Sequence, residues 1–479
     1  MFDRILVLGA GHIGQAIAAL LHGAGDAVTL ADADFSRALA IATAVGARPR
    51  AGGAGRPVMP LAVDADDQAA LATALRDVDA VVNALPYRYA APVARVAAAR
   101  HVHYFDLTED VASTAAIREL DDGARAVLMP QCGLAPGLIG VIGHQLLDGF
   151  DEPRALKLRV GALPRYPVNA LRYNLTWSTD GLINEYINPC EAIVDARRVT
   201  TAALEGYERL LIDGIEYEAF NTSGGLGTLA HTLSAPRAGR PALRQLDYKS
   251  LRYPGHHAIM RTLLGDLALA DRRDLLKQIL EHAVPHTQQD VVVMLACASG
   301  LRGGVLSERV WSRHLHGGVV AGMPMTAIQL TTAVGVCAAL QCVREGGAPS
   351  RGFVSQEQID ATRLLGNRFG RLLDLRAAPA GHGRSGGSTP VGSAVLASGS
   401  PVFPAAGLPG VSDTPAEGAG AILRRWRRRW QAGRNTSRRD GIRNAMNAND
   451  FSALLASIDV PLPPAGEGAL IVRSPIDGN

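Results

Sequence analysis

The sequence predicts an α/β fold in which a doubly wound parallel sheet is combined with a second, mixed α/β domain. An apolar run at Ile5–Leu8 breaks into a glycine-rich turn and then into a helix of small residues. Short apolar runs alternate with helical segments as far as about residue 130, which is the rhythm of a parallel sheet. From about residue 155 the chain changes to alternating stretches such as Leu156–Val160, which are typical of a mixed sheet.

The glycine-rich turn reads Gly9-Ala10-Gly11-His12-Ile13-Gly14 and opens the helix Gln15–Leu21. In such a turn Gly9 allows the sharp bend and Gly11 lets the backbone approach a pyrophosphate. Gly14 lets the helix pack closely on the strand. The free N–H groups at the helix N-terminus favour phosphate binding. The pattern therefore predicts a Rossmann-type dinucleotide-binding unit.

The second strand, Val28–Ala31, ends at Asp32, eighteen residues after Gly14. A carboxylate at this position suits both ribose hydroxyls of NAD and repels the 2′-phosphate of NADP. The sequence therefore predicts NAD as the cofactor, with NADP the less favoured alternative.

The α/β rhythm continues through strands at Val58–Val63, Ala80–Ala84, one ending at Phe105–Leu107, and Ala126–Pro130, with helices at Asp66–Leu75 and Pro92–Ala99. Parallel strands keep their ligand at their carboxyl ends, so Asn83, Asp106 and Cys132 are expected to line one crevice. The expected cofactor contacts are Gly9, Gly11, His12, Ile13, Gly14, Asp32, Asp64, Asn83, Ala84, Leu85 and Leu107, with Asp64 near the adenine.

Three later segments complete the pattern. Residues 258–282 are expected to be helical, and Val291–Ala296 is expected to be a buried strand. The helix Thr326–Arg344, most of which falls in the long uncharged stretch Met323–Val343, is expected either to return to the first domain or to form a subunit interface. Its polar residues would be costly in lipid, so a buried helix is favoured over a membrane span.

Composition limits the function classes. The 479 residues are 47% hydrophobic and 19% charged, with a net charge of +3, which favours a globular protein and gives no overall case for nucleic-acid or membrane binding. Five scattered cysteines without a CxxC pair argue against disulfides or a metal site and favour a reducing, cytoplasmic compartment. The short apolar run near the N-terminus follows Asp3 and Arg4, so no signal peptide is expected.

Several central motifs resemble the saccharopine dehydrogenase family, especially its bacterial members and the lysine 6-dehydrogenases. They are Tyr104–Asp110, Pro130–Gly137, Thr176–Gly181, Ala219–Gly225 and Arg252–His256. The resemblance runs from residue 1 to about 375. It implies a Rossmann domain with an inserted substrate domain, hydride exchange with a nicotinamide, and an α-amino acid substrate. The glutamate-forming fungal members place an arginine near Asn221–Gly225, where this chain has none.

Oxidation of a C–N bond needs a base for the amine proton as well as a hydride acceptor. Asp106 is the leading catalytic candidate, with Glu109 and Asp110 behind it, and helix capping is its alternative role. Cys132 is the second candidate, its alternative being an inert buried thiol. The expected substrate contacts are Arg165, Arg172, Trp177, Thr222, Ser223, Arg252 and His256, with the arginines as carboxylate binders.

Three functions stay open at this point. The first is NAD-dependent oxidation of saccharopine to 2-aminoadipate 6-semialdehyde and glutamate, and the second is oxidative deamination of the lysine side chain. Saccharopine carries three carboxylates and lysine one, so three motif arginines favour the first. The third is a non-catalytic NAD-sensing protein, against which the polar second domain argues. A homodimer is expected.

The C-terminal part differs in composition. Residues 376–445 are rich in Gly, Pro, Ser and Ala and are expected to be disordered or translated intergenic sequence; their basic run Arg424–Trp430 is a weak candidate for anion binding. Residues 451–479 resemble the start of an aldehyde dehydrogenase that oxidises aminoadipate semialdehyde, and Met446 is a candidate start codon. The expected division is as follows. Residues 1–133 bind NAD, residues 134–322 bind the substrate, and residues 323–375 form a helical return to the first domain. Residues 376–445 form the linker, and residues 446–479 are a truncated aldehyde dehydrogenase-like N-terminus.

Overall fold

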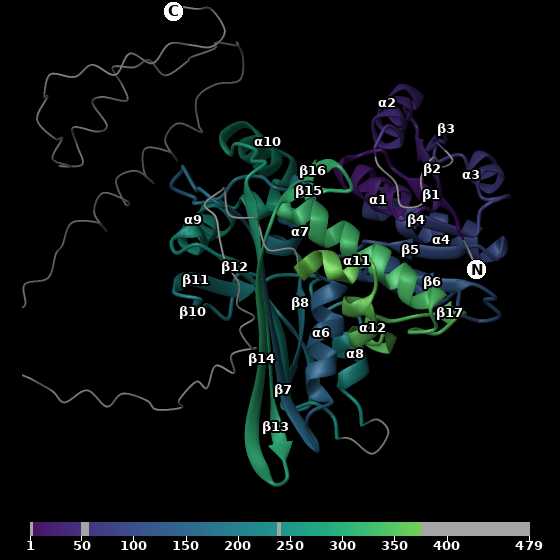
Figure 1. Cartoon of the computed structure of the whole chain (residues 1–479). Coiled ribbons are helices and arrows are strands. Elements are labelled where there is room, and N and C mark those ends of the chain that lie inside the picture. Colours follow the sequence, from purple (N-terminus) through teal and green to yellow (C-terminus); the bar gives the residue numbers. More distant parts are fainter. Residues whose placement is uncertain (1–2, 49–56, 237–240, 375–479) are drawn as a thin grey trace, which may run out of the picture. The chain divides into compact units, whose positions relative to one another are not determined.

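The computed structural model describes residues 3–48, 57–236 and 241–374. The expectations for the C-terminal linker, its basic run and the aldehyde dehydrogenase-like segment all lie outside these residues. Within them, two sheets and their helices form the fold that the sequence predicted (Figure 1).

The first sheet is parallel and has the strand order β17-β6-β5-β4-β1-β2-β3. Its strands are β1 (Arg4–Leu8), β2 (Ala27–Asp32), β3 (Met59–Ala62), β4 (Ala80–Asn83), β5 (His103–Asp106), β6 (Val127–Met129) and β17 (Gly352–Phe353). In register, Leu8 lies beside Asn83, and Asn83 lies beside Asp106. The carboxyl ends of the central strands therefore form one edge, as expected for a Rossmann-type sheet.

Helices cover both faces of this sheet. They are α1 (His12–Gly23), α2 (Phe35–Gly46), α3 (Gln68–Ala74), α4 (Ala90–Ala99) and α5 (Val111–Arg118), with a 3₁₀ turn at Tyr87–Tyr89. Side chains of α1 and α2 share one hydrophobic cluster with Ile5 and Val7, whereas those of α3, α4 and α5 share another with Leu6 and Leu8. This alternation along β1 makes the sheet doubly wound and confirms the predicted fold class.

The second domain is built on a mixed sheet with the order β10-β11-β12-β7-β13-β14. In addition, β8 pairs with β12, and β9 pairs with β8. Its strands are β7 (Glu152–Pro164), β8 (Cys190–Val194), β9 (Arg197–Thr201), β10 (Glu208–Ile212), β11 (Ile215–Asn221), β12 (Gln245–Arg252), β13 (Asp290–Arg302) and β14 (Val305–His316). A separate hairpin joins β15 (Gly318–Val320) to β16 (Met323–Met325). Helix α6 (Leu138–Leu147) packs against β7 and β13, and α7 (Thr179–Ile187) and α8 (Leu229–Leu233) complete the domain.

The segment expected to be helical over 258–282 is helical in separate pieces. The structure has α9 (His256–Arg261), a π-helical turn at Thr262–Asp266, a 3₁₀ turn at Leu269–Asp271, and α10 (Arg273–Ala283). Ala268 has φ +51° and Arg272 has φ −131°, neither of which a continuous helix allows. The apolar spacing identified the helical content, but these two backbone positions divide it.

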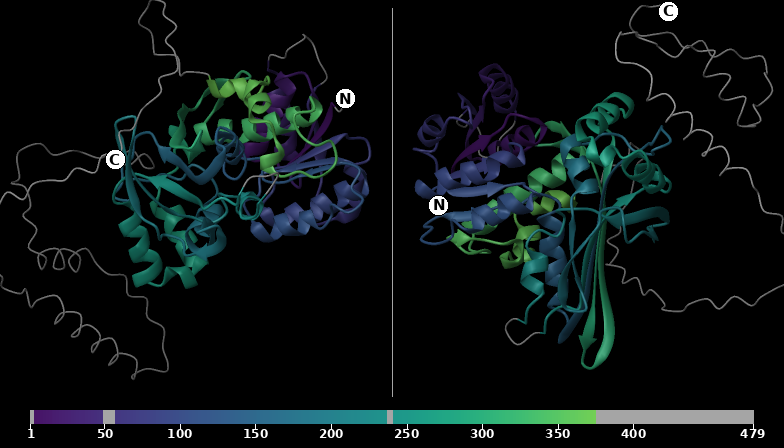
Figure 2. Two further views of the ribbon diagram at one scale, coloured as in Figure 1. Left: turned by 90° about the horizontal axis from the view of Figure 1, so that it is seen from below. Right: turned by 180° about the vertical axis from the view of Figure 1, so that it is seen from behind.

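Helix α11 (Ala327–Arg344) brings the chain back against α1, as one of the two sequence alternatives predicted (Figures 1 and 2). Thr326 caps it through a capping box with Gln329. Among the described residues it is the one helix long and apolar enough to cross a membrane, and most of its residues are buried in the fold. The return continues through a 3₁₀ turn at Gln356–Gln358, α12 (Ala361–Gly366) and a 3₁₀ turn at Gly370–Asp374.

Candidate active site

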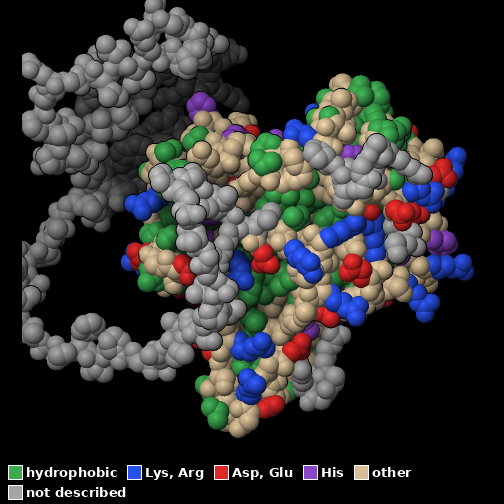
Figure 3. Space-filling view, in the orientation of Figure 1, with side chains coloured by type: hydrophobic (Ala, Val, Ile, Leu, Met, Phe, Trp, Pro, Cys, Tyr) green, Lys and Arg blue, Asp and Glu red, His purple; other side chains and the backbone are tan. Residues whose placement is uncertain are grey.

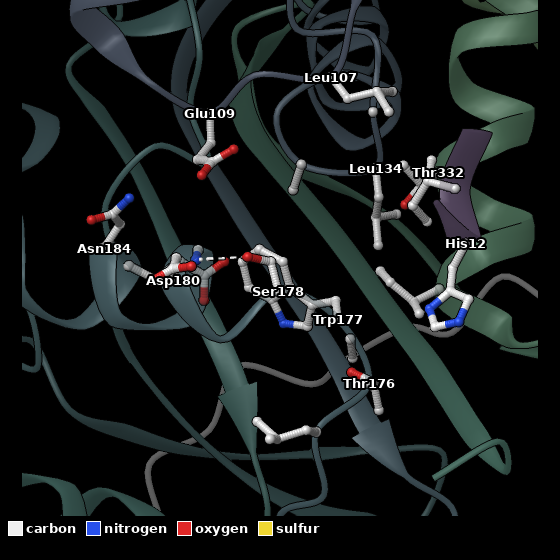
Figure 4. Close-up of a pocket in the computed structure, with 18 of the residues that line it drawn as sticks. His12, Leu107, Glu109, Leu134, Thr176, Trp177, Ser178, Asp180, Asn184 and Thr332 are labelled. Carbon is white, nitrogen blue, oxygen red and sulfur yellow. Dashed lines mark hydrogen bonds between the residues drawn. The ribbon is translucent and has the colours of Figure 1, made fainter. Parts of the chain in front are cut away.

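One cavity of about 990 Å³ lies between the carboxyl edge of the Rossmann sheet and the second domain. The Rossmann side contributes Gly11–Ile13, Ala84–Arg88 and Leu107–Glu109. The second domain contributes residues of the Thr176–Gly181 motif, the following turn of α7 and the end of β12. In Figure 4, His12, Leu134 and Thr332 lie on one side of the cavity, and Glu109, Asp180 and Asn184 lie on the other.

The glycine turn has the geometry that a dinucleotide phosphate requires. Gly9 has φ +97°, which favours glycine, and a Cβ on Gly14 would lie 1.8 Å from the Gly9 carbonyl oxygen. A Cβ on Gly11 would meet nothing within 4 Å, because this position faces the open cavity. Gly11 caps α1 without a side-chain hydrogen bond, which leaves the helix N-terminus available to an anion. The residues present therefore fit NAD(P).

The carboxylate of Asp32 supports this turn. Its Oδ2 accepts a hydrogen bond from the Ala10 amide at 2.8 Å, and its Oδ1 accepts one from the Asp34 amide at 3.0 Å. The Arg37 guanidinium lies 3.7 Å from Oδ1 and is mostly exposed. Asp64, in contrast, is exposed and bonds to the Asp66 amide. Neither carboxylate lines the cavity around His12.

Asn83, Asp106 and Cys132 form a buried layer directly beneath the cavity. Asp106 accepts hydrogen bonds from the Tyr104 hydroxyl and from the amides of Thr108 and Gln131. Burial raises its pKa to about 6, although these three bonds oppose the rise. The structure brings the three residues together, as predicted, but Leu107 and Glu109 line the cavity in their place. The helix cap of α5 is Asp110.

Cys132 is 3% exposed, and its thiol donates to the Met129 carbonyl oxygen at 3.2 Å. Burial raises the thiol pKa well above its ordinary value, so the sulfur is protonated at neutral pH. Asn83 donates to the Tyr104 hydroxyl and accepts from the Leu85 amide, and it thereby shapes the Ala84–Leu85 turn that does line the cavity.

Arg252 is the buried cation of the cavity wall. Its side chain is 3% exposed, and its Nε donates to the Tyr186 hydroxyl at 2.6 Å while Nη1 donates to the Leu251 carbonyl at 2.8 Å. The rings of Tyr173 and Tyr186 lie 5.1 and 5.4 Å from the guanidinium carbon. The side chain is therefore held in place before any ligand arrives.

His256 fixes this arrangement from behind. Its Nδ1 lies 2.9 Å from the Leu171 carbonyl oxygen, and its Nε2 lies 2.9 Å from the Tyr186 hydroxyl. A carbonyl oxygen only accepts, so Nδ1 carries the proton and the neutral Nε2 accepts from Tyr186. Burial lowers the pKa of His256 to about 3, which keeps the imidazole neutral. His256 thus supports Arg252 and does not itself line the cavity.

The other predicted substrate contacts divide between the cavity and its surroundings. Trp177 lines the cavity and packs on Gly181, where a Cβ would lie 2.3 Å from the indole ring. Thr222 lies behind the wall, with its hydroxyl 2.8 Å from that of the lining residue Ser250. Ser223 bonds to Glu185 and Pro189 carbonyl oxygens. Arg165 and Arg172 are exposed outside the cavity.

Several charged residues line the cavity although the sequence did not single them out as contacts, among them Glu185, Arg88 and Arg273. Glu109, which the sequence placed behind Asp106, lines it as well. Burial raises the pKa of Glu185 to about 7 and also raises the pKa of Glu109. Arg273 donates to the side chains of Asn184 and Asn188. Glu185 lies four residues after Gly181 on the same face of α7, a spacing that would have pointed to it once Gly181 was placed at the site.

The described residues contain no group of three metal-ligating side chains suited to a metal ion, and the five cysteines are free. On the face shown in Figure 3, acidic and basic side chains are interspersed, so no face of one charge is seen there.

Comparisons of the sequence and of the fold with known proteins both find saccharopine dehydrogenases. Residues 5–128 match the saccharopine dehydrogenase NADP binding domain, and residues 133–373 match the saccharopine dehydrogenase C-terminal domain. Saccharopine dehydrogenase (L-Glu forming) from Saccharomyces cerevisiae has a similar fold, with a TM-score of 0.60 and 17% identity over 76% of this chain and 95% of that chain.

The C. glutamicum DAP dehydrogenase is a more distant neighbour, with a TM-score of 0.37 and 12% identity over 78% of this chain and 99% of that chain. The two matches together span almost all of the described fold, including the glycine turn and the second-domain wall of the cavity. The chain therefore belongs to the saccharopine dehydrogenase family and is an NAD(P)-binding oxidoreductase.

Proposed function

We propose that this protein oxidises the secondary amine of saccharopine with NAD and releases 2-aminoadipate 6-semialdehyde and glutamate. The observation that carries the proposal is that one cavity is lined both by the glycine turn and by Arg88, Arg252 and Arg273. Saccharopine has three carboxylates, and guanidinium groups are the preferred partners of carboxylates. Lysine has one carboxylate, so this set of arginines favours saccharopine.

The groups of the chain have separate roles in this proposal. Bound at the glycine turn, NAD supplies the acceptor for the hydride from the carbon next to the nitrogen. Glu109 is the acidic residue of the Asp106–Asp110 segment that lines the cavity. We propose that its carboxylate is the base that accepts the proton of the substrate amine. Asp106 holds this segment through the Thr108 amide. Water then adds to the resulting imine, and the C–N bond breaks to give the aldehyde and glutamate.

NAD is proposed over NADP because Asp32 places a carboxylate at the end of β2. Each oxygen already accepts one backbone hydrogen bond, and a carboxylate oxygen has two acceptor sites, so both remain able to accept a ribose hydroxyl. A 2′-phosphate at the same place would face this negative charge.

The test is to follow NADH formation at 340 nm with saccharopine and with lysine, and to assay glutamate and ammonia. Glutamate released in step with NADH supports the proposal. Ammonia from lysine, without turnover of saccharopine, would establish the second candidate, a lysine 6-dehydrogenase. NAD binding without turnover of either amino acid would contradict both reactions.

A further inference from the structure

The wall of the cavity places an anion directly beside its buried cation. Glu185 of α7 and Arg252 at the end of β12 both line the cavity, with Glu185 Oε2 3.5 Å from Arg252 Nη2. Charge-assisted hydrogen bonds of this kind are usually about 2.7–2.9 Å long, so the contact is a loose one. Arg252 directs its shorter bonds to Tyr186 and Leu251. Both charged groups therefore retain capacity for a ligand.

The donor and acceptor inventory supports this conclusion. A guanidinium has five N–H groups, and the bonds to Tyr186, Leu251 and Glu185 account for three of them. Within the described part of the chain, the Glu185 carboxylate has no side-chain partner other than Arg252. Its side chain is 15% exposed, so it is largely removed from water while still facing the cavity.

The surroundings add negative charge near Glu185. Glu109 approaches from the Rossmann side, and the loop that follows β11 contacts both acids. A Cβ on Gly224 would lie 3.0 Å from that of Glu109, and the Ser223 amide donates to the Glu185 carbonyl oxygen. Glu109 thus adds a second, partly buried carboxyl group beside the Glu185–Arg252 pair. An ammonium group on a ligand would offset this excess of negative charge, and a carboxylate would accept from the N–H groups of Arg252 that its three bonds leave over.

We propose that Glu185 and Arg252 bind the α-ammonium and the α-carboxylate of the amino-acid end of the substrate. In an α-amino acid the ammonium and the carboxylate are attached to the same carbon, so they lie close together. Glu185 and Arg252 are likewise neighbours on the cavity wall. A plain dicarboxylate would bring an anion against Glu185 and is disfavoured. The inference deepens the proposed function and applies to both candidate substrates, since saccharopine and lysine share this end.

Three small ligands separate the two contacts. Lysine carries both charges, 6-aminohexanoate lacks only the α-ammonium, and 1,5-diaminopentane lacks only the carboxylate. Titration calorimetry on the full chain saturated with NADH measures their dissociation constants without turnover. In the wild type we expect lysine to bind at least tenfold more tightly than either analogue.

The variants then assign each contact. Glu185→Gln should weaken lysine at least tenfold and change 6-aminohexanoate less than twofold. Arg252→Gln should weaken lysine and 6-aminohexanoate while 1,5-diaminopentane is unchanged. Glu119→Gln, which removes an exposed charge at the end of α5, is the matched control and should change none of them. Thermal unfolding of each variant checks that the fold is intact.

Equal weakening of all three ligands by Glu185→Gln would show a structural role and overturn the inference, as would equal binding of lysine and 6-aminohexanoate to the wild type or no binding of lysine. If the ligand pattern appears but neither saccharopine nor lysine is oxidised, the proposed reaction fails and the head-group site stands. If saccharopine or lysine is oxidised but the ligand pattern does not appear, the proposed reaction stands and the proposed roles of Glu185 and Arg252 fail.

Discussion

At the scale of single residues, burial determines which charged groups act as ligand contacts and which act as supports. Asp32 supports the glycine turn, and in the proposed function it also binds the ribose. Its carboxylate holds the Ala10 amide of the glycine turn, and it also stands at the end of β2 where the ribose of a dinucleotide binds. Arg37 lies close enough to offer a cation to a phosphate if that carboxylate is removed.

We therefore expect Asp32→Ser to lower the ratio of kcat/KM with NAD to kcat/KM with NADP by at least tenfold. NAD loses its carboxylate acceptor, and the 2′-phosphate of NADP no longer meets a like charge. Absolute rates should fall with both cofactors because the Ala10 amide loses its partner. Arg37→Ala in the Asp32→Ser background should move this ratio back toward the wild-type value. An unchanged ratio in Asp32→Ser would contradict the assignment.

If Glu185 binds the substrate ammonium as proposed, its raised pKa should make substrate binding depend on pH. Burial places this pKa at about 7, so the carboxyl is mostly neutral at pH 6 and mostly charged at pH 8. Only the charged form attracts an ammonium, so KM for the amino-acid substrate should fall about tenfold from pH 6 to pH 8. Glu109 and Arg252 are the charged groups that face Glu185 and contribute to its pKa.

The measurement is KM for the substrate at half-unit intervals of pH, with the cofactor saturating. In Glu185→Gln the dependence between pH 6 and pH 8 should disappear, whereas Glu119→Gln should retain it. A dependence that persists in Glu185→Gln would place the titrating group elsewhere in the cavity.

The sequence identified segments that border the cavity but not always the side chain that lines it. Asp106 ends β5, and from the strand end alone it is the natural candidate. The loop after it turns so that Thr108 and Gln131 bond to Asp106 from above, and Glu109 reaches the cavity. Neither a 3.6-residue nor a 2-residue period applies in a loop, so side-chain direction there depends on tertiary contacts. Arg252 was singled out only as an arginine of a family-like motif, and of the three arginines chosen, it alone lines the cavity.

At the scale of elements, one buried carboxylate joins the second sheet to α11. Asp290, at the start of β13, is 2% exposed and accepts hydrogen bonds from the amides of Ala327 and Ile328. These are the first amides of α11, which have no partner within the helix. The bond supplements the Thr326 capping box and fixes the helix that returns to the Rossmann sheet.

We expect Asp290→Ala to lower the free energy of unfolding by about 2 kcal/mol, because two buried amides lose their acceptor. Urea unfolding followed by circular dichroism measures the change. Asp360→Ala, which removes the more exposed cap of α12, is the comparison and should cost about 1 kcal/mol or less. An Asp290→Ala variant as stable as the wild type would mean that Thr326 alone caps α11.

Helices and strands whose apolar residues recur regularly could be predicted from the sequence. Strands that exist only because they pair with a distant segment could not. The strands β1, β2 and β4 and the helix α11 follow their apolar runs closely. β17 is only Gly352–Phe353, too short for any pattern, and it exists because Gly352 and Phe353 pair with Val127 and Leu128 far away in the sequence. Such pairing depends on the packed return segment and leaves no local signal.

At the scale of the whole molecule, the two domains share one hydrophobic core. A single cluster runs from Ile17 of α1 through Val334 of α11 and Ile142 of α6 to Leu158 and Met294 of the second sheet. A buried ion cluster reinforces the return, since Asp26 lies 3.0 Å from Arg344 and 3.2 Å from Arg368. The cavity is therefore built on a common support, which keeps its two walls at a defined separation.

The described residues 3–374 already contain this support and the cavity lining, and the family match ends at residue 373. We therefore expect the chain ending at residue 384 to keep the thermal midpoint of the full chain and to have a kcat/KM within about twofold of it.

A chain ending at residue 350 is the contrasting control. It lacks β17 and the Arg368 partner of Asp26, and it leaves α11 without the side chains of Leu364 and Phe369 in the core. A buried charge that loses a partner and a core that loses large side chains are both strongly destabilising. The shorter chain should therefore lose cooperative unfolding and cofactor binding together, whereas loss of binding in the longer one would mean that residues 385–479 take part in the site.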